Sequence, residues 1–106
     1  MRRIHVALAV DDLEATVDDY TERLDAEPVA VVPGKYALWR TDEVNLSVNA
    51  DASTAQRLRH LGFEDDAVTE KTESHDVNGI MWESFSSTWQ DRGLVRIYGW
   101  PLPPPD

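Results

Sequence analysis

The chain has 106 residues, of which 42% are hydrophobic, and its 20 acidic and 10 basic side chains give a net charge of −10. This length favours a single domain spanning residues 1–106, with a modest core. The acidic charge and the lack of a basic stripe make nucleic acid and anionic membranes poor partners, because both carry negative charge.

The chain has no cysteine, which excludes disulfides, thiolate metal sites and a cysteine nucleophile. No apolar run approaches the ~20 residues that span a bilayer. The apolar run after Arg2 and Arg3 is short and is followed directly by Asp11, so it is more typical of a strand than of a signal peptide. We therefore expect a cytoplasmic protein. High acidity with only two lysines is typical of proteins from salt-loving archaea, although many mesophilic domains are also acidic.

The first half of the chain predicts the order β-α-β-β-β. Residues 3–10 are rich in Val, Ile and Leu and predict a buried strand. Asp11 is a good helix N-cap, and apolar side chains then recur on one helical face until Pro28 prevents continuation. Three further strands are expected at residues 29–32, 36–39 and 44–48. The first module therefore covers residues 1–50.

The second half, residues 57–98, predicts mostly strands, at 57–63, 68–75, 80–85 and 94–98. The turn at residues 76–79 contains Asn-Gly, the strongest hairpin signal in the chain, and residues 90–93 predict another turn. His60 and Glu83 lie only 23 positions apart, whereas a complete βαβ crossover needs ~30 residues. A full helix is therefore not expected between them, and residues 101–106 predict a Pro-rich tail.

Polar side chains interrupt several of these strands on one face. Because side chains alternate along a strand, His5 and Asn45 each lie opposite the apolar face of their strands. This pattern predicts a sheet with one face that lines a partly polar cavity, and His5, Asn45, His60 and Glu83 are all candidates for that cavity. Two imidazoles and one carboxylate from three strands can hold a divalent metal and leave positions open for a substrate. A histidine alone in a strand is more often a hydrogen-bonded core residue.

Three segments carry a recognisable pattern: residues 4–14, which are followed by Asp19-Tyr20, Leu24 and Glu27-Pro28; residues 59–63; and residues 76–85. The first segment resembles the opening of the vicinal oxygen chelate superfamily, which includes glyoxalase I, bleomycin-resistance proteins and extradiol dioxygenases. Residues 59–63 resemble the first strand of that superfamily's second module, and residues 76–85 resemble its closing turn and strand. The resemblance implies an α+β fold in which paired βαβββ modules form a cupped sheet, here with a reduced second module. It also implies that His5, His60 and Glu83 bind the metal.

The chain departs from this pattern in several places. Asn45 stands where glyoxalase I has a glutamate ligand, and the cysteine pair that holds arsenic in arsenical lyases is absent. An alternative register would place residues 93–98 on the closing strand, where Arg96 would replace the glutamate and the metal site would be lost. We favour Glu83, because the Asp-x-Asn-Gly turn and the Trp-Glu pair match together.

The resemblance implies a metal-dependent enzyme that coordinates two adjacent oxygens of a small molecule and acts as a lyase, isomerase or dioxygenase. The metal would be Fe, Ni, Mn, Zn or Co, acting as a Lewis acid. Asn45, Ser47 and Trp39 are candidates for the substrate pocket. Arg40 and Arg96 either pair with a substrate carboxylate or form surface salt bridges.

The alternative is a non-catalytic module that binds a small molecule or another protein. The shortened second module supports this reading, since a cup that lacks a helix and a strand is open. The same feature leads us to expect a homodimer, which would cover exposed sheet edges. The choice between lyase, isomerase and dioxygenase chemistry stays open at this point.

Overall fold

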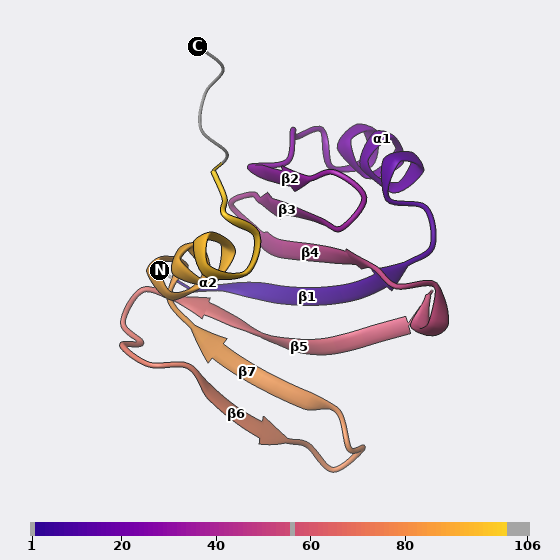
Figure 1. Cartoon of the computed structure of the whole chain (residues 1–106). Coiled ribbons are helices and arrows are strands. Elements are labelled where there is room, and N and C mark those ends of the chain that lie inside the picture. Colours follow the sequence, from indigo (N-terminus) through magenta and orange to yellow (C-terminus); the bar gives the residue numbers. More distant parts are fainter. Residues whose placement is uncertain (1, 56, 102–106) are drawn as a thin grey trace.

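The protein folds as one seven-stranded mixed sheet with a helix on each face (Figure 1). The computed structural model describes residues 2–55 and 57–101. The strand order is β2-β3-β4-β1-β5-β7-β6, so the fold belongs to the expected α+β class. In chain order the elements are β1 (Arg2–Val10), α1 (Leu13–Leu24), β2 (Ala30–Val32), β3 (Tyr36–Arg40), β4 (Val44–Ala50), a short 3-10 helix (Ala52–Thr54), β5 (Arg57–Asp65), β6 (Thr72–His75), β7 (Met81–Phe85) and α2 (Ser87–Tyr98).

The first half has the predicted β-α-β-β-β order. The N-cap of α1 is Asp12 rather than Asp11, since the Asp12 side chain accepts a hydrogen bond from the backbone N–H of Ala15. The helix ends at Asp25, which adopts a left-handed conformation. Strand β4 returns to pair in parallel with β1, which places Asn45 beside His5.

The second half repeats part of this arrangement. Strand β5 pairs antiparallel with β1, and β7 pairs in parallel with β5, as β4 does with β1. Between β5 and β7 the described residues form turns and β6, without a helix, as the spacing of His60 and Glu83 predicted. Two parallel strand pairs, β4–β1 and β5–β7, therefore lie side by side at the centre of the sheet and are joined by the antiparallel pairing of β1 with β5.

The predicted strand at residues 94–98 is wrong, because these residues form the second half of α2. The Ser86 side chain caps this helix by accepting from the N–H of Trp89, and Gly99 ends it in a left-handed conformation. The predicted turn at residues 90–93 lies inside the helix. The closing strand is β7, so Arg96 does not take the place of Glu83.

Two hydrophobic clusters hold the helices to opposite faces of the sheet. One cluster lies under α1 and contains Leu13, Ala37, Trp39 and Val48. The other joins α2 to β2 and β3 through Ala30, Tyr36, Leu38 and Leu94. Since α2 packs on this end of the sheet, the same face stays open over β1, β5 and β7. Among the described residues, no helix is long and apolar enough to cross a membrane.

Candidate metal centre

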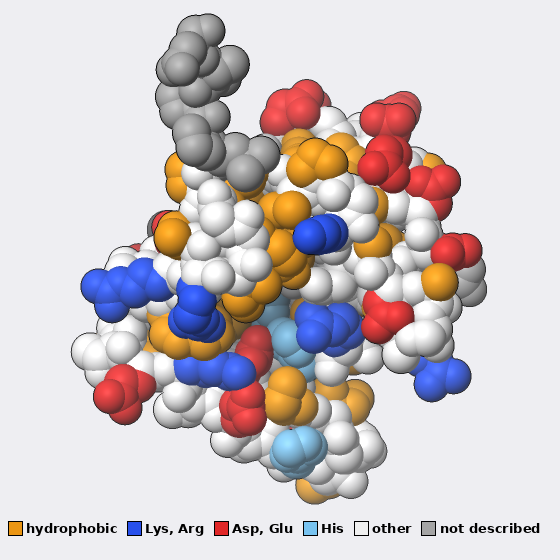
Figure 2. All heavy atoms as spheres, viewed as in Figure 1, with side chains coloured by type: hydrophobic (Ala, Val, Ile, Leu, Met, Phe, Trp, Pro, Cys, Tyr) orange, Lys and Arg blue, Asp and Glu red, His pale blue; other side chains and the backbone are white. Residues whose placement is uncertain are grey.

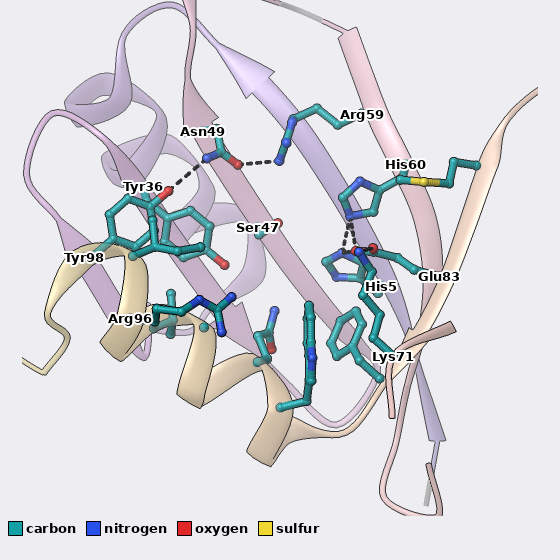
Figure 3. A pocket seen from close by; sticks show the side chains of 17 residues that line it. His5, Tyr36, Ser47, Asn49, Arg59, His60, Lys71, Glu83, Arg96 and Tyr98 are labelled. Atoms are coloured by element: carbon teal, nitrogen blue, oxygen red, sulfur yellow. Dashed lines mark hydrogen bonds and ion pairs between the residues drawn. The ribbon is translucent and has the colours of Figure 1, made fainter. Parts of the chain in front are cut away.

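His5, His60 and Glu83 meet on the open face of the sheet (Figure 3). Each offers one ligand atom, and these atoms lie within 4.8 Å of one another. The two histidine Nε2 atoms are 3.0 Å apart, and Glu83 Oε1 lies 2.6 Å from His60 Nε2 and 3.9 Å from His5 Nε2. All three residues are buried, with exposures of 2%, 9% and 7%. The structure thus brings together the three residues that the sequence proposed as ligands.

The register of the central strands produces this convergence. On the antiparallel pair β1–β5, His5 lies opposite Gly62 and His60 lies opposite Ala7, so both imidazoles point to the same face. Gly62 in turn lies beside Glu83 on β7. A Cβ at Gly62 would approach the backbone oxygen of Glu83 to 1.9 Å. A glycine at this position therefore allows β5 and β7 to approach closely enough for Glu83 to reach the histidines.

Asn45 fixes the orientation and the tautomer of His5. His5 Nδ1 lies 2.9 Å from Asn45 Oδ1 and 3.2 Å from the Asn45 backbone oxygen. The amide group cannot be reversed, because Asn45 Nδ2 donates to Glu64 Oε1 at 2.8 Å and to Gln90 Oε1 at 2.7 Å. Both neighbours of Nδ1 are therefore acceptors, so Nδ1 carries the proton. The lone pair of Nε2 then faces the space between His60 and Glu83.

A buried ionic network lies behind Asn45. The Glu64 carboxylate is 2% exposed and pairs with Arg3 at 2.7 Å and with Arg40 at 3.1 Å. Arg40 also donates to Gln90 Oε1 at 2.8 Å and pairs with Asp91 at 2.8 Å, which ties β3 to α2. Sequence reasoning missed Glu64 and Gln90. The only signal for Glu64 was its alternation with His60 and Gly62 along β5.

The surroundings shift the pKa values in the direction that metal binding requires. Burial lowers the pKa of His5 below its ordinary value, with the nearby His60 adding to this effect, so His5 is neutral at neutral pH. Burial acts to raise the pKa of Glu83, but hydrogen bonds from His60 and Lys71 outweigh it and bring the pKa to about 2. Lys71 holds Glu83 Oε2 at 3.0 Å, which leaves Oε1 facing the histidines.

The site opens into a cavity of about 350 Å³ between the sheet and α2. Figure 2 shows histidine atoms at the base of a hollow with lysine or arginine atoms beside them. The residues that line the cavity are His5, Tyr36, Ser47, Asn49, Arg59, His60, Lys71, Met81, Glu83, Phe85, Trp89, Gln90, Gly93, Leu94, Arg96, Ile97 and Tyr98. Much of its wall therefore comes from α2, the element that the sequence did not predict.

The three pocket candidates have different positions. Ser47 lines the cavity. Asn45 is fully buried behind His5 and acts as its hydrogen-bond partner rather than as part of the wall. Trp39 was placed wrongly: it alternates with Leu38 and Arg40 along β3, so it lies on the opposite face, in the cluster under α1 and against Tyr20.

The strand register also shows which residue of the first half is equivalent to Glu83. His5 and His60 exchange places across the β1–β5 pair, because His5 faces Gly62 and His60 faces Ala7. Gly62 lies beside Glu83, and Ala7 lies beside Ser47. Ser47, not Asn45, is therefore the counterpart of Glu83 in the first half. Its short hydroxyl side chain lines the cavity.

No family model and no curated protein matches the chain. Its fold is similar to a solved chain described as an NAD-dependent benzaldehyde dehydrogenase from Legionella pneumophila, with a TM-score of 0.55. The two are 13% identical in sequence, and the alignment covers 78% of this chain and 97% of the other. At this identity the likeness shows the fold alone.

The donor set fits a divalent metal ion. Two ligands bound at ~2.1 Å and at right angles lie about 3.0 Å apart, which agrees with the separation of the two Nε2 atoms. Two imidazoles and one carboxylate suit Fe, Mn, Co, Ni or Zn, and three protein ligands leave coordination positions for water or substrate. His5, His60 and Glu83 could therefore hold such an ion. His5 Nε2 already presents its lone pair, and His60 Nε2 would give up the proton that it donates to Glu83 when the ion binds.

Proposed function

We propose that the protein is a divalent-metal-dependent enzyme of the vicinal oxygen chelate type, which acts on a small molecule through two adjacent oxygens. The convergence of His5 Nε2, His60 Nε2 and Glu83 Oε1 beside an open cavity carries this proposal. The arrangement of the strands supports it, since a β-α-β-β-β unit is followed by a reduced second unit paired to it through β1 and β5.

The chain contributes binding, orientation and charge. A bound divalent ion would supply a Lewis acid that draws negative charge from two adjacent substrate oxygens. Asn45 holds His5 in the tautomer that presents Nε2, and Lys71 holds the second oxygen of Glu83. The short side chain of Ser47 leaves room beside the ligands for the substrate. Phe85 and Trp89 form an apolar wall that limits access of water.

Metal analysis of protein purified without a histidine tag tests this proposal. We expect the wild type to bind one of Fe, Ni, Mn, Zn or Co at about one ion per chain. His60→Ala and Glu83→Ala should each lose the ion, because each removes one of three ligands. His75→Ala is the matched control, since His75 is exposed on β6 and lies outside the ligand group.

The outcomes separate the readings. Wild-type protein that binds none of these ions above the level of the two ligand variants rejects the metalloenzyme. Binding that is lost equally in His75→Ala would show that the ions bind elsewhere on the surface. Metal-free protein that binds small molecules in the cavity would favour the non-catalytic binding module instead.

We also propose a homodimer. On the face opposite the cavity, Ile4 is 41% exposed and Leu58 is 42% exposed. A second copy that packs on this face would remove apolar surface from water and supply the cover that the second half of the chain lacks. Light scattering coupled to size exclusion, in high salt to screen the acidic charge, should give twice the chain mass. A strict monomer at 100 μM would reject the dimer.

A further inference from the structure

The charge of the cavity is opposite in sign to that of the whole chain. The chain carries −10, yet three cationic side chains line the cavity, Arg59, Lys71 and Arg96, against a single carboxylate, Glu83. Lys71 is already paired with Glu73 and Glu83. Among residues 2–55 and 57–101, no carboxylate lies within ion-pair distance of Arg59 or Arg96, although 20 acidic residues are present in the chain.

The backbone directs Arg59 into the cavity by an irregularity in β5. Ala7 pairs with His60 and Leu8 pairs with Leu58, so Arg59 is the extra residue of a bulge. In a regular strand, neighbouring side chains point to opposite faces, whereas here Arg59 and His60 both line the cavity. Arg59 Nη1 donates to Asn49 Oδ1 at 2.8 Å, which holds the guanidinium at the rim and leaves its other N–H groups unused within the described residues.

Arg96 reaches the cavity from the other side. It lies on α2, and Figure 3 shows it beside Tyr36 and Tyr98, across the cavity from the two histidines. Arg40, by contrast, is held by Glu64, Asp91 and Gln90, so it is not available to a ligand. Of the two arginines that the sequence offered as carboxylate partners, the geometry keeps only Arg96, and it adds Arg59.

The remaining wall defines the rest of the ligand. Phe85 and Trp89 pack against each other with ring centroids 5.5 Å apart and ring planes 36° apart, and Met81 and Leu94 also line the cavity. A volume of about 350 Å³ holds roughly a dozen water-sized groups at ~30 Å³ each. A flat apolar ring of this size fits against the aromatic wall, with polar groups at its two ends.

We propose that the cavity binds a small aromatic or similarly flat carboxylate, whose carboxylate group is held by Arg59 and Arg96 while its opposite end faces His5, His60 and Glu83. Charge-assisted hydrogen bonds from guanidinium groups give this specificity. The part of the proposal that concerns the metal rests on the proposed function, whereas the preference for a carboxylate does not.

A matched pair of probes tests the preference. In zinc-loaded protein, 3,4-dihydroxybenzoate should bind at least about 10-fold more tightly than catechol, which has the same adjacent oxygens but no carboxylate. The double variant Arg59→Gln/Arg96→Gln should reduce this ratio to about one. The control Arg57→Gln/Arg92→Gln removes the same charge from outside the cavity wall and should keep the ratio.

A second pair separates this inference from the metal site. In metal-free protein, benzoate should bind more tightly than benzyl alcohol, and only the Arg59→Gln/Arg96→Gln variant should remove the difference. A preference that survives this variant, or is equally lost in the control variant, overturns the inference, as does a wild type without preference for either carboxylate. Failure to bind zinc together with a retained benzoate preference would reject the metalloenzyme and leave the carboxylate site standing.

Discussion

Replacing Asn45 by leucine, which has a similar shape but no polar atoms, should disturb the metal centre through His5. Asn45 accepts from His5 Nδ1 at 2.9 Å and donates to Glu64 and Gln90 at 2.8 and 2.7 Å. Three buried hydrogen bonds at about 1 kcal/mol each suggest a loss of about 3 kcal/mol in the free energy of unfolding. Loss of the partner that orients a metal-binding histidine typically costs 10–100-fold in metal affinity, or about 1.4–2.8 kcal/mol.

Nitrogen-15 NMR of the imidazole rings measures the cause directly. In metal-free wild-type protein at neutral pH, we expect the proton of His5 on Nδ1, because both neighbours of that nitrogen are acceptors. The Asn45→Leu variant should give a mixture of tautomers together with weaker binding in zinc calorimetry. Asn49→Leu is the matched control: it lies on the same strand and face but contacts Tyr98 and Arg59 instead, so its zinc affinity should equal that of the wild type.

A His5 proton found on Nε2 in the wild type would refute this reasoning, since the lone pair would then face away from the ligand group. Equal zinc affinities for Asn45→Leu and the wild type would refute it as well. A loss of stability alone would not support it, because any change at a fully buried position can lower stability.

Two further predictions concern the strands that carry the ligands. Gly62→Ala should lower the free energy of unfolding by about 3 kcal/mol or more, because the new Cβ would lie 1.9 Å from the Glu83 backbone oxygen, whereas real Cβ contacts stay above 3.0 Å; a thermal melt within about 2 °C of the wild type would contradict this close approach. The pKa of Glu83, lowered from 4.5 to about 2, means that the folded carboxylate binds its proton less readily than the unfolded one. The contribution of Glu83 to the free energy of unfolding is therefore present above pH 4.5 and is lost as the pH falls toward 2. Denaturant titrations of metal-free protein should show a fall of about 3 kcal/mol over this range that is missing in Glu83→Gln; equal acid sensitivity of the two proteins would contradict it.

The alternation of side chains explains why the ligand set could be predicted from the sequence. His5, His60 and Glu83 each interrupt an apolar strand, and the period of two places each on the face opposite its apolar neighbours. What alternation cannot give is the pairing register, which decides that Ser47 rather than Asn45 occupies the position equivalent to Glu83. Trp39 was assigned to the pocket because of its aromatic character alone. The alternation of side chains along its strand already placed it on the opposite face from the pocket.

The second helix was missed because of one glycine. Gly93 within Gln90-Asp91-Arg92-Gly93 is typical of a turn, and the β-branched residues Val95 and Ile97 favour a strand. In the structure, Trp89, Gly93 and Leu94 share the helical face toward the sheet, with Ser86 as the cap. The helical spacing of these residues was present in the sequence. Packing of Leu94 on Tyr36 and Leu38 outweighs the local preference of residues 90–98 for a turn and a strand.

The glycine has a consequence for the cavity as well. Gly93 is buried and lines the cavity wall, and a Cβ built on it would meet only the end of the Arg96 side chain, at 4.0 Å. The space beside this position is therefore open, and the glycine leaves it unfilled. Together with Ser47 on the facing strand, it keeps the cavity open between Arg96 and the ligand group. Because Gly93 and Ser47 are the two smallest residues of the cavity wall, a larger side chain at either position would reduce the volume left for a bound molecule.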